Sequence, residues 1–225
     1  MKAFFTLVLA LLCTTLSAQR KRITLYDTLG HETTYEMHFA AVVIGTHKSS
    51  YDKAANKKVL VPMPKEEFAK ELQKTEKRIQ EPQMVGKNMP DFDLADINGN
   101  RISKKDLAGK VAVINFWFIG CAPCEMERPA LNILRDKYRE RDDVVFLSIA
   151  RDSLDAVTNF VKDQPINYTL YPSTREYIKE TFSINQFPIN IVADRQGKYF
   201  FYGTGSGIGI VNVMQKQIEA ALAAK

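Results

Sequence analysis

The chain has 225 residues and a mass of 25.5 kDa, and its composition (45% hydrophobic, 25% charged, 11 Gly and 9 Pro) is that of an ordinary globular protein. This composition excludes a long disordered chain, a collagen-like fibre and a disulfide-dense miniprotein, and no apolar run reaches the ~20 residues of a membrane-spanning helix. The 31 basic and 26 acidic residues give a net charge of +5. The excess is scattered over the N-terminal third, so nucleic-acid binding is not expected.

Residues 1–18 have the three parts of a secretory signal peptide: a basic start, an apolar stretch over residues 3–13 and small residues ending at Ala18. We expect cleavage after Ala18 and export, which places the mature chain in a bacterial periplasm. Lipidation of Cys13 is an alternative, although Leu12 is bulkier than the residue that normally precedes a lipidated cysteine.

Loss of this leader leaves two cysteines, Cys121 and Cys124, in a compartment where disulfides persist. A bridge across so short a loop restricts the unfolded chain little, because that stabilisation grows with loop length. The spacing therefore indicates a pair kept for chemistry.

Residues 19–84 predict a small accessory α+β region that serves a partner or positions the rest of the chain. The expected elements are strands at 23–27 and 33–44, an extended segment at 57–64 and a helix at 65–80. Phe68, Leu72 and Ile79 share one face of that helix. The apolar stretch 39–44 needs burial, either against the rest of the chain or in a dimer.

From residue 85 onwards the hydrophobic pattern is sharper. The expected elements are a hairpin around Asn98-Gly99 (strands 91–94 and 101–102), a strand at 111–117, a helix at 121–138, a strand at 144–150, helices at 153–163 and 174–182, a hairpin of strands 189–193 and 198–202, and a helix at 208–223. This order predicts an α/β fold with a mixed central sheet and helices on both faces.

The C-x-x-C motif lies between the strand at 111–117 and the helix that follows. Cys121 would sit at the amino end of the helix, where free backbone N–H groups and the helix dipole favour a thiolate. Cys124 would lie one turn further on, close enough to attack a mixed disulfide at Cys121. Pro123 would occupy an early helical position, where its missing N–H has no consequence.

Two other uses of such cysteines are less well supported. A zinc site would need two further soft ligands, whereas the mature chain has no other cysteine and its histidines, His31, His38 and His47, all lie in the accessory region. A peroxidatic cysteine usually follows a proline and a threonine, and residues 117–120 contain neither. We expect no metal and no cofactor.

The residues around the motif resemble the thioredoxin superfamily and, within it, the exported TlpA/ResA-like thiol-disulfide oxidoreductases. The matching positions are Asn115-Phe116-Trp117, Cys121-Ala122-Pro123-Cys124, Glu127, Pro129 and Leu131, with Pro90-Asp91-Phe92 and Asn98-Gly99 upstream. The resemblance implies a thioredoxin-like domain over residues 85–225, after a signal peptide (1–18) and the accessory region (19–84).

The resemblance also implies roles for individual residues. Cys121 would be the attacking thiol and Cys124 the resolving thiol of a redox-active disulfide. Cytosolic thioredoxins carry a buried aspartate at the position of Asn115, which cannot titrate, so Glu127 would be the acid that passes protons. The alternative for Glu127 is an ordinary solvated glutamate on a helix.

The second expected feature of the site is a cis peptide bond between Phe187 and Pro188. In thioredoxin folds such a proline faces the disulfide at the start of a late strand, and the neighbouring backbone binds an extended substrate. Trp117, Phe187 and Pro188 are therefore the expected substrate-binding residues; a trans proline at a strand edge is the alternative. Gly120 stands where the family commonly has tryptophan, and Phe187 where it has a small or β-branched residue.

The resemblance implies an exported enzyme that reduces protein disulfides with electrons from a membrane thiol carrier. Cytochrome c maturation is one such role. A disulfide oxidant or isomerase on the same fold, and a redox-inert binding module, are the alternatives. The expected partners are protein dithiols and disulfides.

Overall fold

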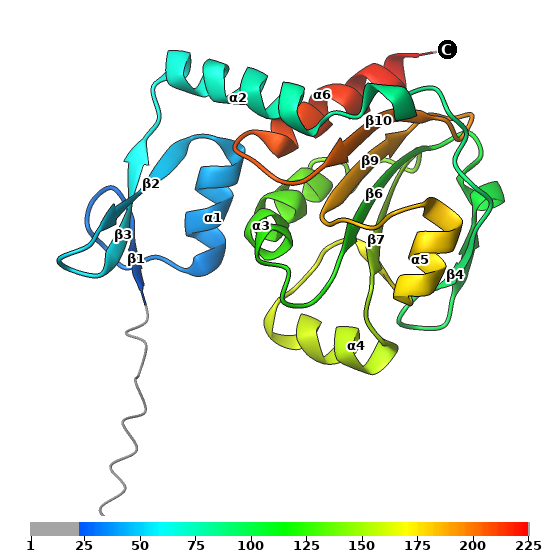
Figure 1. Ribbon diagram of the computed structural model, residues 1–225, viewed down its shortest axis with the longest axis horizontal. Coiled ribbons are helices and arrows are strands. Elements are labelled where there is room, and N and C mark those ends of the chain that lie inside the picture. Colours follow the sequence, from blue (N-terminus) through cyan, green and yellow to red (C-terminus); the bar gives the residue numbers. More distant parts are fainter. Residues whose placement is uncertain (1–22, 225) are drawn as a thin grey trace, which may run out of the picture.

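The computed structural model describes residues 23–224, which form an N-terminal region (residues 23–79) packed on a C-terminal domain (residues 80–224) (Figure 1). The expected leader, with Cys13 in it, lies outside the described residues. None of the described helices is both long and apolar enough to span a bilayer.

The N-terminal region consists of a small sheet and two helices. Its elements are β1 (Thr24–Tyr26), α1 (Tyr35–Ile44), β2 (His47–Asp52), β3 (Lys57–Pro62) and α2 (Lys65–Ile79). The strands lie in the order β1-β3-β2, with β1 parallel and β2 antiparallel to β3. The expected first strand, the extended segment at 57–64 and the helix at 65–80 are confirmed, with small shifts of their ends.

The strand expected over residues 33–44 is wrong, because this segment forms helix α1. The hydroxyl of Thr34 caps the helix by accepting a hydrogen bond from the N–H of Met37 at 3.2 Å. Gly45 ends the helix in the left-handed region, with φ of +89°. Residues 39–44 are apolar all round the helix, so they show no helical period in the sequence.

A five-stranded mixed sheet forms the centre of the C-terminal domain. Its strands are β6 (Val111–Trp117), β7 (Val144–Ala150), β8 (Thr169–Pro172), β9 (Ile189–Ala193) and β10 (Tyr199–Thr204). They lie in the order β10-β9-β6-β7-β8, in which β7 is parallel to β6 and β8, and β9 is antiparallel to β6 and β10. The expected α/β class is confirmed.

Successive residues of β6 point to opposite faces of this sheet. The other elements of the domain are the hairpin of β4 (Asp93–Ala95) and β5 (Arg101–Ser103), helices α3 (Ala122–Asp136), α4 (Leu154–Asp163), α5 (Arg175–Phe182) and α6 (Ile210–Ala223), and the short 3-10 helices η1 (Pro82–Met84) and η2 (Lys104–Leu107). Val111 and Val113 pack with α3 and α6 on one face, whereas Ile114 and Phe116 pack with α5 and the hairpin on the other.

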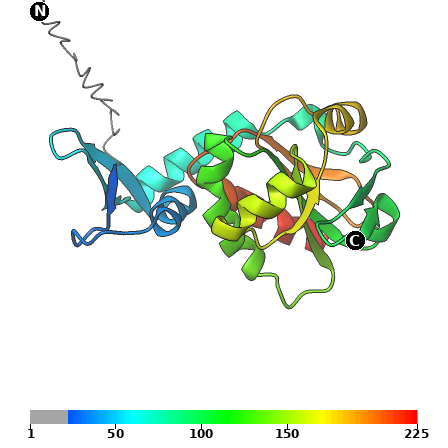
Figure 2. The same ribbon diagram turned by 90° about the horizontal axis from the view of Figure 1, so that it is seen from below.

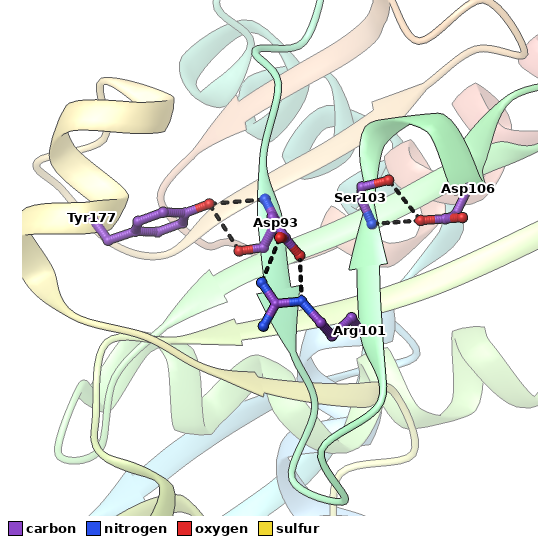
Figure 3. A network of polar contacts seen from close by, with 5 residues as sticks. All are labelled: Asp93, Arg101, Ser103, Asp106 and Tyr177. Carbon is purple, nitrogen blue, oxygen red and sulfur yellow. Dashed lines mark hydrogen bonds and ion pairs between the residues drawn. The ribbon is translucent and has the colours of Figure 1, made fainter.

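Polar contacts fix the hairpin to α5 (Figure 3). The hydroxyl of Tyr177 accepts a hydrogen bond from the N–H of Asp93 at 3.0 Å and donates one to the carbonyl of Asp93 at 3.1 Å. Arg101 forms an ion pair with Asp93 across the two strands. At the end of β5, the carboxylate of Asp106 accepts from both the N–H and the hydroxyl of Ser103 at 2.7 Å. The hairpin is therefore held against the face of the sheet opposite α3.

The N-terminal region packs on the domain through its two helices (Figures 1 and 2). Helix α1 lies against α3 and α6, and α2 lies against α6. Phe39 and Val43 of α1 are only 7% and 4% exposed. Of the two ways of burying residues 39–44, the structure shows packing against the rest of the chain.

Both edges of the five-stranded sheet are bordered by other backbone. Residues 80–89 run along β10, where the N–H of Glu81 donates to the carbonyl of Tyr202 at 2.9 Å. At the opposite edge, the N–H of Ile97 in the hairpin turn donates to the carbonyl of Leu170 of β8 at 3.0 Å.

Candidate active site

Cys121 and Cys124 lie at the amino end of α3, directly after the central strand β6. Cys121 is the N-cap residue of the helix, and the two cysteines form a disulfide with their Cα atoms 5.3 Å apart. They are 4% and 5% exposed. A thiol at this position lies beside the unpaired N–H groups of the first helical turn, which stabilise its thiolate once the disulfide is reduced.

Two carboxylates fix the loop before Cys121. The N–H of Ile119 donates to Asp152, and the N–H of Gly120 donates to Glu125, each at 2.9 Å. Gly120 has φ of +85°, a region that glycine adopts at little cost, and a Cβ at this position would have no neighbour within 4 Å. The position at which the family commonly carries tryptophan is thus open space beside the disulfide.

Glu127, one turn after Cys124, is fully buried between α3 and the sheet. One carboxylate oxygen accepts hydrogen bonds from the side-chain amides of Asn115 at 3.3 Å and Asn190 at 3.0 Å. Burial raises the pKa of Glu127 from 4.5 to about 7, against the opposing effect of these hydrogen bonds. The solvated helix glutamate considered as its alternative is therefore not what the structure shows.

The polar residues around Glu127 come from three neighbouring strands in register. Asn190 of β9 and Ser148 of β7 are both paired with Asn115 of β6, so the three side chains share one face of the sheet. The indole N–H of Trp117 donates to the hydroxyl of Ser148 at 2.7 Å. Asn190 and Ser148 were not among the site residues predicted from the sequence. The available signal was a single polar residue within each buried apolar strand.

A cavity of about 20 Å³ adjoins Cys124 on the same side of the sheet, and Asn115, Ser148 and Tyr168 contribute to its lining. Its volume is enough for one water molecule. The hydroxyl of Tyr168 is buried without a hydrogen-bond partner within the described chain. A further hydrogen bond, with the Ser206 side chain, also lowers the pKa of Glu127 against the effect of burial. No hydrogen bond joins Glu127 to Cys124 among the described residues, and Asn115 links the cavity to the Glu127 carboxylate.

The peptide bond between Phe187 and Pro188 is cis, as expected. The ring of Phe187 meets the edge of Phe118, with centroids 5.4 Å apart, and the guanidinium of Arg151 lies 4.0 Å from the centre of the Phe118 ring. Trp117 points the other way: it is 3% exposed and packs on Phe160. Its role in substrate binding stays a prediction, and Phe118 and Arg151 are the surface residues that the sequence analysis missed.

The N-terminal region reaches the helix that carries the cysteines. Arg128 of α3 is buried, and its guanidinium contacts the carboxylate of Glu36 of α1 at 3.3 Å. It also donates to the carbonyl of Pro165 at 3.2 Å and to the side chain of Gln164. One arginine thus joins α1, α3 and the loop after α4.

No group of three or more His, Cys, Asp or Glu side chains within residues 23–224 is arranged to hold a metal ion. His31, His38 and His47 each share a hydrogen bond with a side chain of the N-terminal region.

Comparison with known proteins agrees with this geometry. Residues 85–199 match the AhpC/TSA family. Thiol-disulfide oxidoreductase ResA of a Bacillus cereus strain is 35% identical over 118 residues, which cover 52% of this chain and 68% of that protein. ResA of Bacillus subtilis (strain 168) is 28% identical over 122 residues, 54% of this chain and 68% of that protein.

Solved structures give the same result for the fold. A thiol:disulfide interchange protein of the thioredoxin family from Chlorobium tepidum is 26% identical, with a TM-score of 0.51 over 60% of this chain and 95% of that structure. The thioredoxin domain of a thiol-disulfide oxidoreductase from Bacteroides vulgatus is 21% identical, with a TM-score of 0.51. That match covers 60% of this chain and 97% of the solved structure. This chain therefore belongs to the AhpC/TSA family, has a thioredoxin fold, and is an enzyme of the thiol-disulfide oxidoreductase type.

Proposed function

We propose that this chain is an exported enzyme that reduces protein disulfides through the dithiol of Cys121 and Cys124. The observation that carries the proposal is the disulfide at the amino end of α3, with Cys121 as the N-cap residue. The buried acid Glu127 and the cis peptide before Pro188, at the two positions that the family pattern assigns to them, add support.

In the proposed reaction, the thiolate of Cys121 attacks one sulfur of a substrate disulfide. The substrate S–S bond breaks, the departing sulfur takes up a proton, and a mixed disulfide joins Cys121 to the substrate. Cys124 then loses its proton and attacks the sulfur of Cys121, which releases the second substrate thiol and leaves the Cys121–Cys124 disulfide. Two electrons pass to the substrate, and a donor dithiol must return two electrons to the enzyme.

Glu127 is proposed to take up and return the proton of Cys124. A carboxyl with a pKa of about 7 exchanges protons readily near neutral pH. Asn115 donates to this carboxylate and lines the cavity beside Cys124, so it orients the Glu127 carboxylate and borders a space that holds one water molecule. The proton itself would pass between Cys124 and Glu127 through water.

The substrate is proposed to lie along Phe187 and Pro188 as an extended segment. The N–H and C=O of Phe187 have no main-chain partner among the described residues, so they are free to pair with another strand. Trp117 belongs to the buried cluster on which Phe118 and Phe187 pack, so it would support this surface from inside the domain.

Export rests on residues 1–18, and a membrane thiol carrier as electron donor rests on the family resemblance, as does cytochrome c maturation as one physiological role. Residues 19–84 are proposed as an accessory region that positions α3, since α1 packs on that helix. A disulfide oxidant or isomerase is the second candidate, because the same geometry serves either direction of exchange.

The reduction potential of the Cys121–Cys124 couple tests the direction. Related C-x-x-C couples span about −270 to −120 mV. We expect a value near the reducing end, together with turnover in an insulin reduction assay that Cys121→Ser abolishes. A value near −120 mV would assign the oxidant role. If neither the wild-type protein nor Cys121→Ser reduced insulin, the redox-inert binding module would be the remaining function.

A further inference from the structure

Three side chains from separate segments form a wall beside the disulfide. Phe118 follows β6, Arg151 follows β7 and Phe187 precedes the cis proline. The guanidinium of Arg151 lies 4.0 Å from the ring centre of Phe118 and 5.2 Å from that of Phe187. Both rings pack against the buried cluster that contains Cys121 and Cys124. The wall therefore borders the place where a mixed disulfide would form.

The backbone fixes Arg151 in this position. Its N–H donates to the carbonyl of Trp117 at 2.9 Å, which ties the first residue after β7 to the last residue of β6. The two ring faces hold the guanidinium through cation–π contacts. A guanidinium held over aromatic rings makes no hydrogen bond to them through its N–H groups, so these donors stay available for a bidentate contact.

Arg151 has no carboxylate partner within residues 23–224, although Asp96 and Asp152 line the same pocket as Arg151. Asp96 is engaged by the side chain and the N–H of Asn100 and by the N–H of Asn98. Asp152, the next residue, turns to accept from the N–H of Ile119, and Glu125 accepts from the N–H of Gly120, each at 2.9 Å. Arg151 is itself half-buried. Within the described chain, no side-chain nitrogen of Arg151 is among the buried atoms that lack a partner, so solvent reaches the guanidinium and a ligand carboxylate can replace that solvent.

We propose that Arg151 is a specificity-determining residue that binds a carboxylate of the substrate polypeptide next to its reacting cysteine. The preferred substrates would carry Asp or Glu beside that cysteine. This inference rests on the proposed exchange reaction at Cys121. Arg151 acts on the choice of substrate and takes no part in the transfer of electrons.

The test uses the mature protein and three disulfide-linked peptide dimers that differ only in the residue after the cysteine, which is Glu, Gln or Lys. The rate constant for reduction by the dithiol form is expected to be about tenfold higher for the Glu peptide than for the Gln peptide. Glu125 and Asp152 favour the Lys peptide, so the comparison of Glu with Gln is the decisive one. The preference should weaken as salt is added.

Arg151→Gln should bring the ratio of the Glu and Gln rates close to one, mainly by lowering the rate for the Glu peptide. Arg151→Lys should keep part of the preference, because the charge remains while the planar fork is lost. Arg139→Gln, an exposed arginine beyond the far end of α3, is the matched control and should keep the full preference. Melting temperatures of the three variants check that each is folded.

Other outcomes would overturn the proposal. Equal rates for the three peptides with the wild-type protein reject the role of Arg151 and leave the exchange reaction intact. If Arg151→Gln slows every peptide equally and raises the pKa of the Cys121 thiol, Arg151 stabilises the thiolate instead. If neither the reduced protein with peptide disulfides nor the oxidised protein with peptide thiols exchanges, the proposed function itself fails.

Discussion

The C-terminal domain buries its sheet on both faces, whereas the N-terminal region covers its own sheet on one side only. All seven residues of β6 are buried. In the N-terminal sheet, by contrast, Leu60 is the one strand residue that is buried. Helix α1 is therefore shared between the small sheet and α3 of the domain. A sheet with one buried residue contributes little core, so the stability of this region depends on docking to the helix that carries the cysteines.

The largest effect is expected from substitutions of the two cysteines, which should abolish catalytic turnover and leave the N-terminal region packed on the domain. Cys121→Ser removes the attacking sulfur and should reduce insulin reduction to the uncatalysed background, while α1 stays docked on α3. Cys124→Ser should instead accumulate the mixed disulfide at Cys121, visible as a covalent adduct by mass spectrometry. Turnover of Cys121→Ser at the wild-type rate would show that the exchange chemistry lies elsewhere.

Glu127 should give the C-terminal domain a pH dependence of its own. The folded-state pKa of about 7 lies above the ordinary 4.5, so the folded protein binds this proton more tightly than the unfolded chain. The contribution of Glu127 to stability should therefore fall as the pH rises from about 4.5 to about 7, by about 3 kcal/mol, and stay level above that range. Burial lowers the pKa of His38 in α1, so the contribution of His38 has the opposite sign and should be the same in wild type and in a Glu127 variant.

Glu127→Gln should remove this slope, and denaturant unfolding at a series of pH values measures it. The variant should also change the pH dependence of thiol exchange. Glu140→Gln, an exposed control, should keep the wild-type slope. Identical slopes for wild type and Glu127→Gln would mean that the Glu127 carboxylate ionises as freely in the folded protein as in the unfolded chain.

Val43→Ala tests the docking interface. Val43 is 4% exposed, so loss of two methyl groups should destabilise the docked state by about 2 kcal/mol. Hydrogen exchange should quicken in α1 and α2 and stay slow in β6, because the domain keeps its own core. Met37→Ala on the exposed side of α1 is the control, within about 0.5 kcal/mol of wild type. Equal loss of protection in β6 would make the two parts one cooperative unit.

The smallest effect is expected for Glu36→Gln, which weakens the ion pair to Arg128. Glu36 is partly exposed and Arg128 keeps its contacts with residues 164 and 165, so the loss should stay below about 1 kcal/mol. The rate of insulin reduction should change by less than about twofold. Glu32→Gln is the matched control. A tenfold loss of activity for Glu36→Gln alone would show that the N-terminal region helps to build the active site.

The sequence predictions were more accurate for the C-terminal domain than for the N-terminal region, because the two differ in how they bury their elements. Strands β6 and β7 are apolar apart from Asn115 and Ser148 because the domain buries both faces, and their bounds were predicted correctly. Residues 39–44 of helix α1 are apolar all round because the helix packs on two sides, and this pattern hid its helical period. Strand β2 is mostly polar and exposed, and β8 is short, so neither was expected.

Within the site, the motif identified the residues that are close in sequence. Cys121, Cys124 and Glu127 lie on one helix, and Phe187-Pro188 is recognisable as a pair. Ser148, Asn190 and Arg151 reach the site only through strand register, which the chain order does not reveal. Their positions could be found only once β7 and β9 were placed on either side of β6.

Because the backbone of residues 80–89 covers the edge strand β10, the residue at which the chain is truncated should decide whether the fragment self-associates. Residues 80–89 give β10 a neighbour beyond β9, through the N–H groups of Glu81 and Gly86 among others. An edge strand without such cover exposes a row of unpaired N–H and C=O groups, with which another chain can form hydrogen bonds. A fragment that starts after residue 89 should therefore self-associate, even though every strand of its sheet is present, while one that starts near residue 80 should remain monomeric at the same concentration.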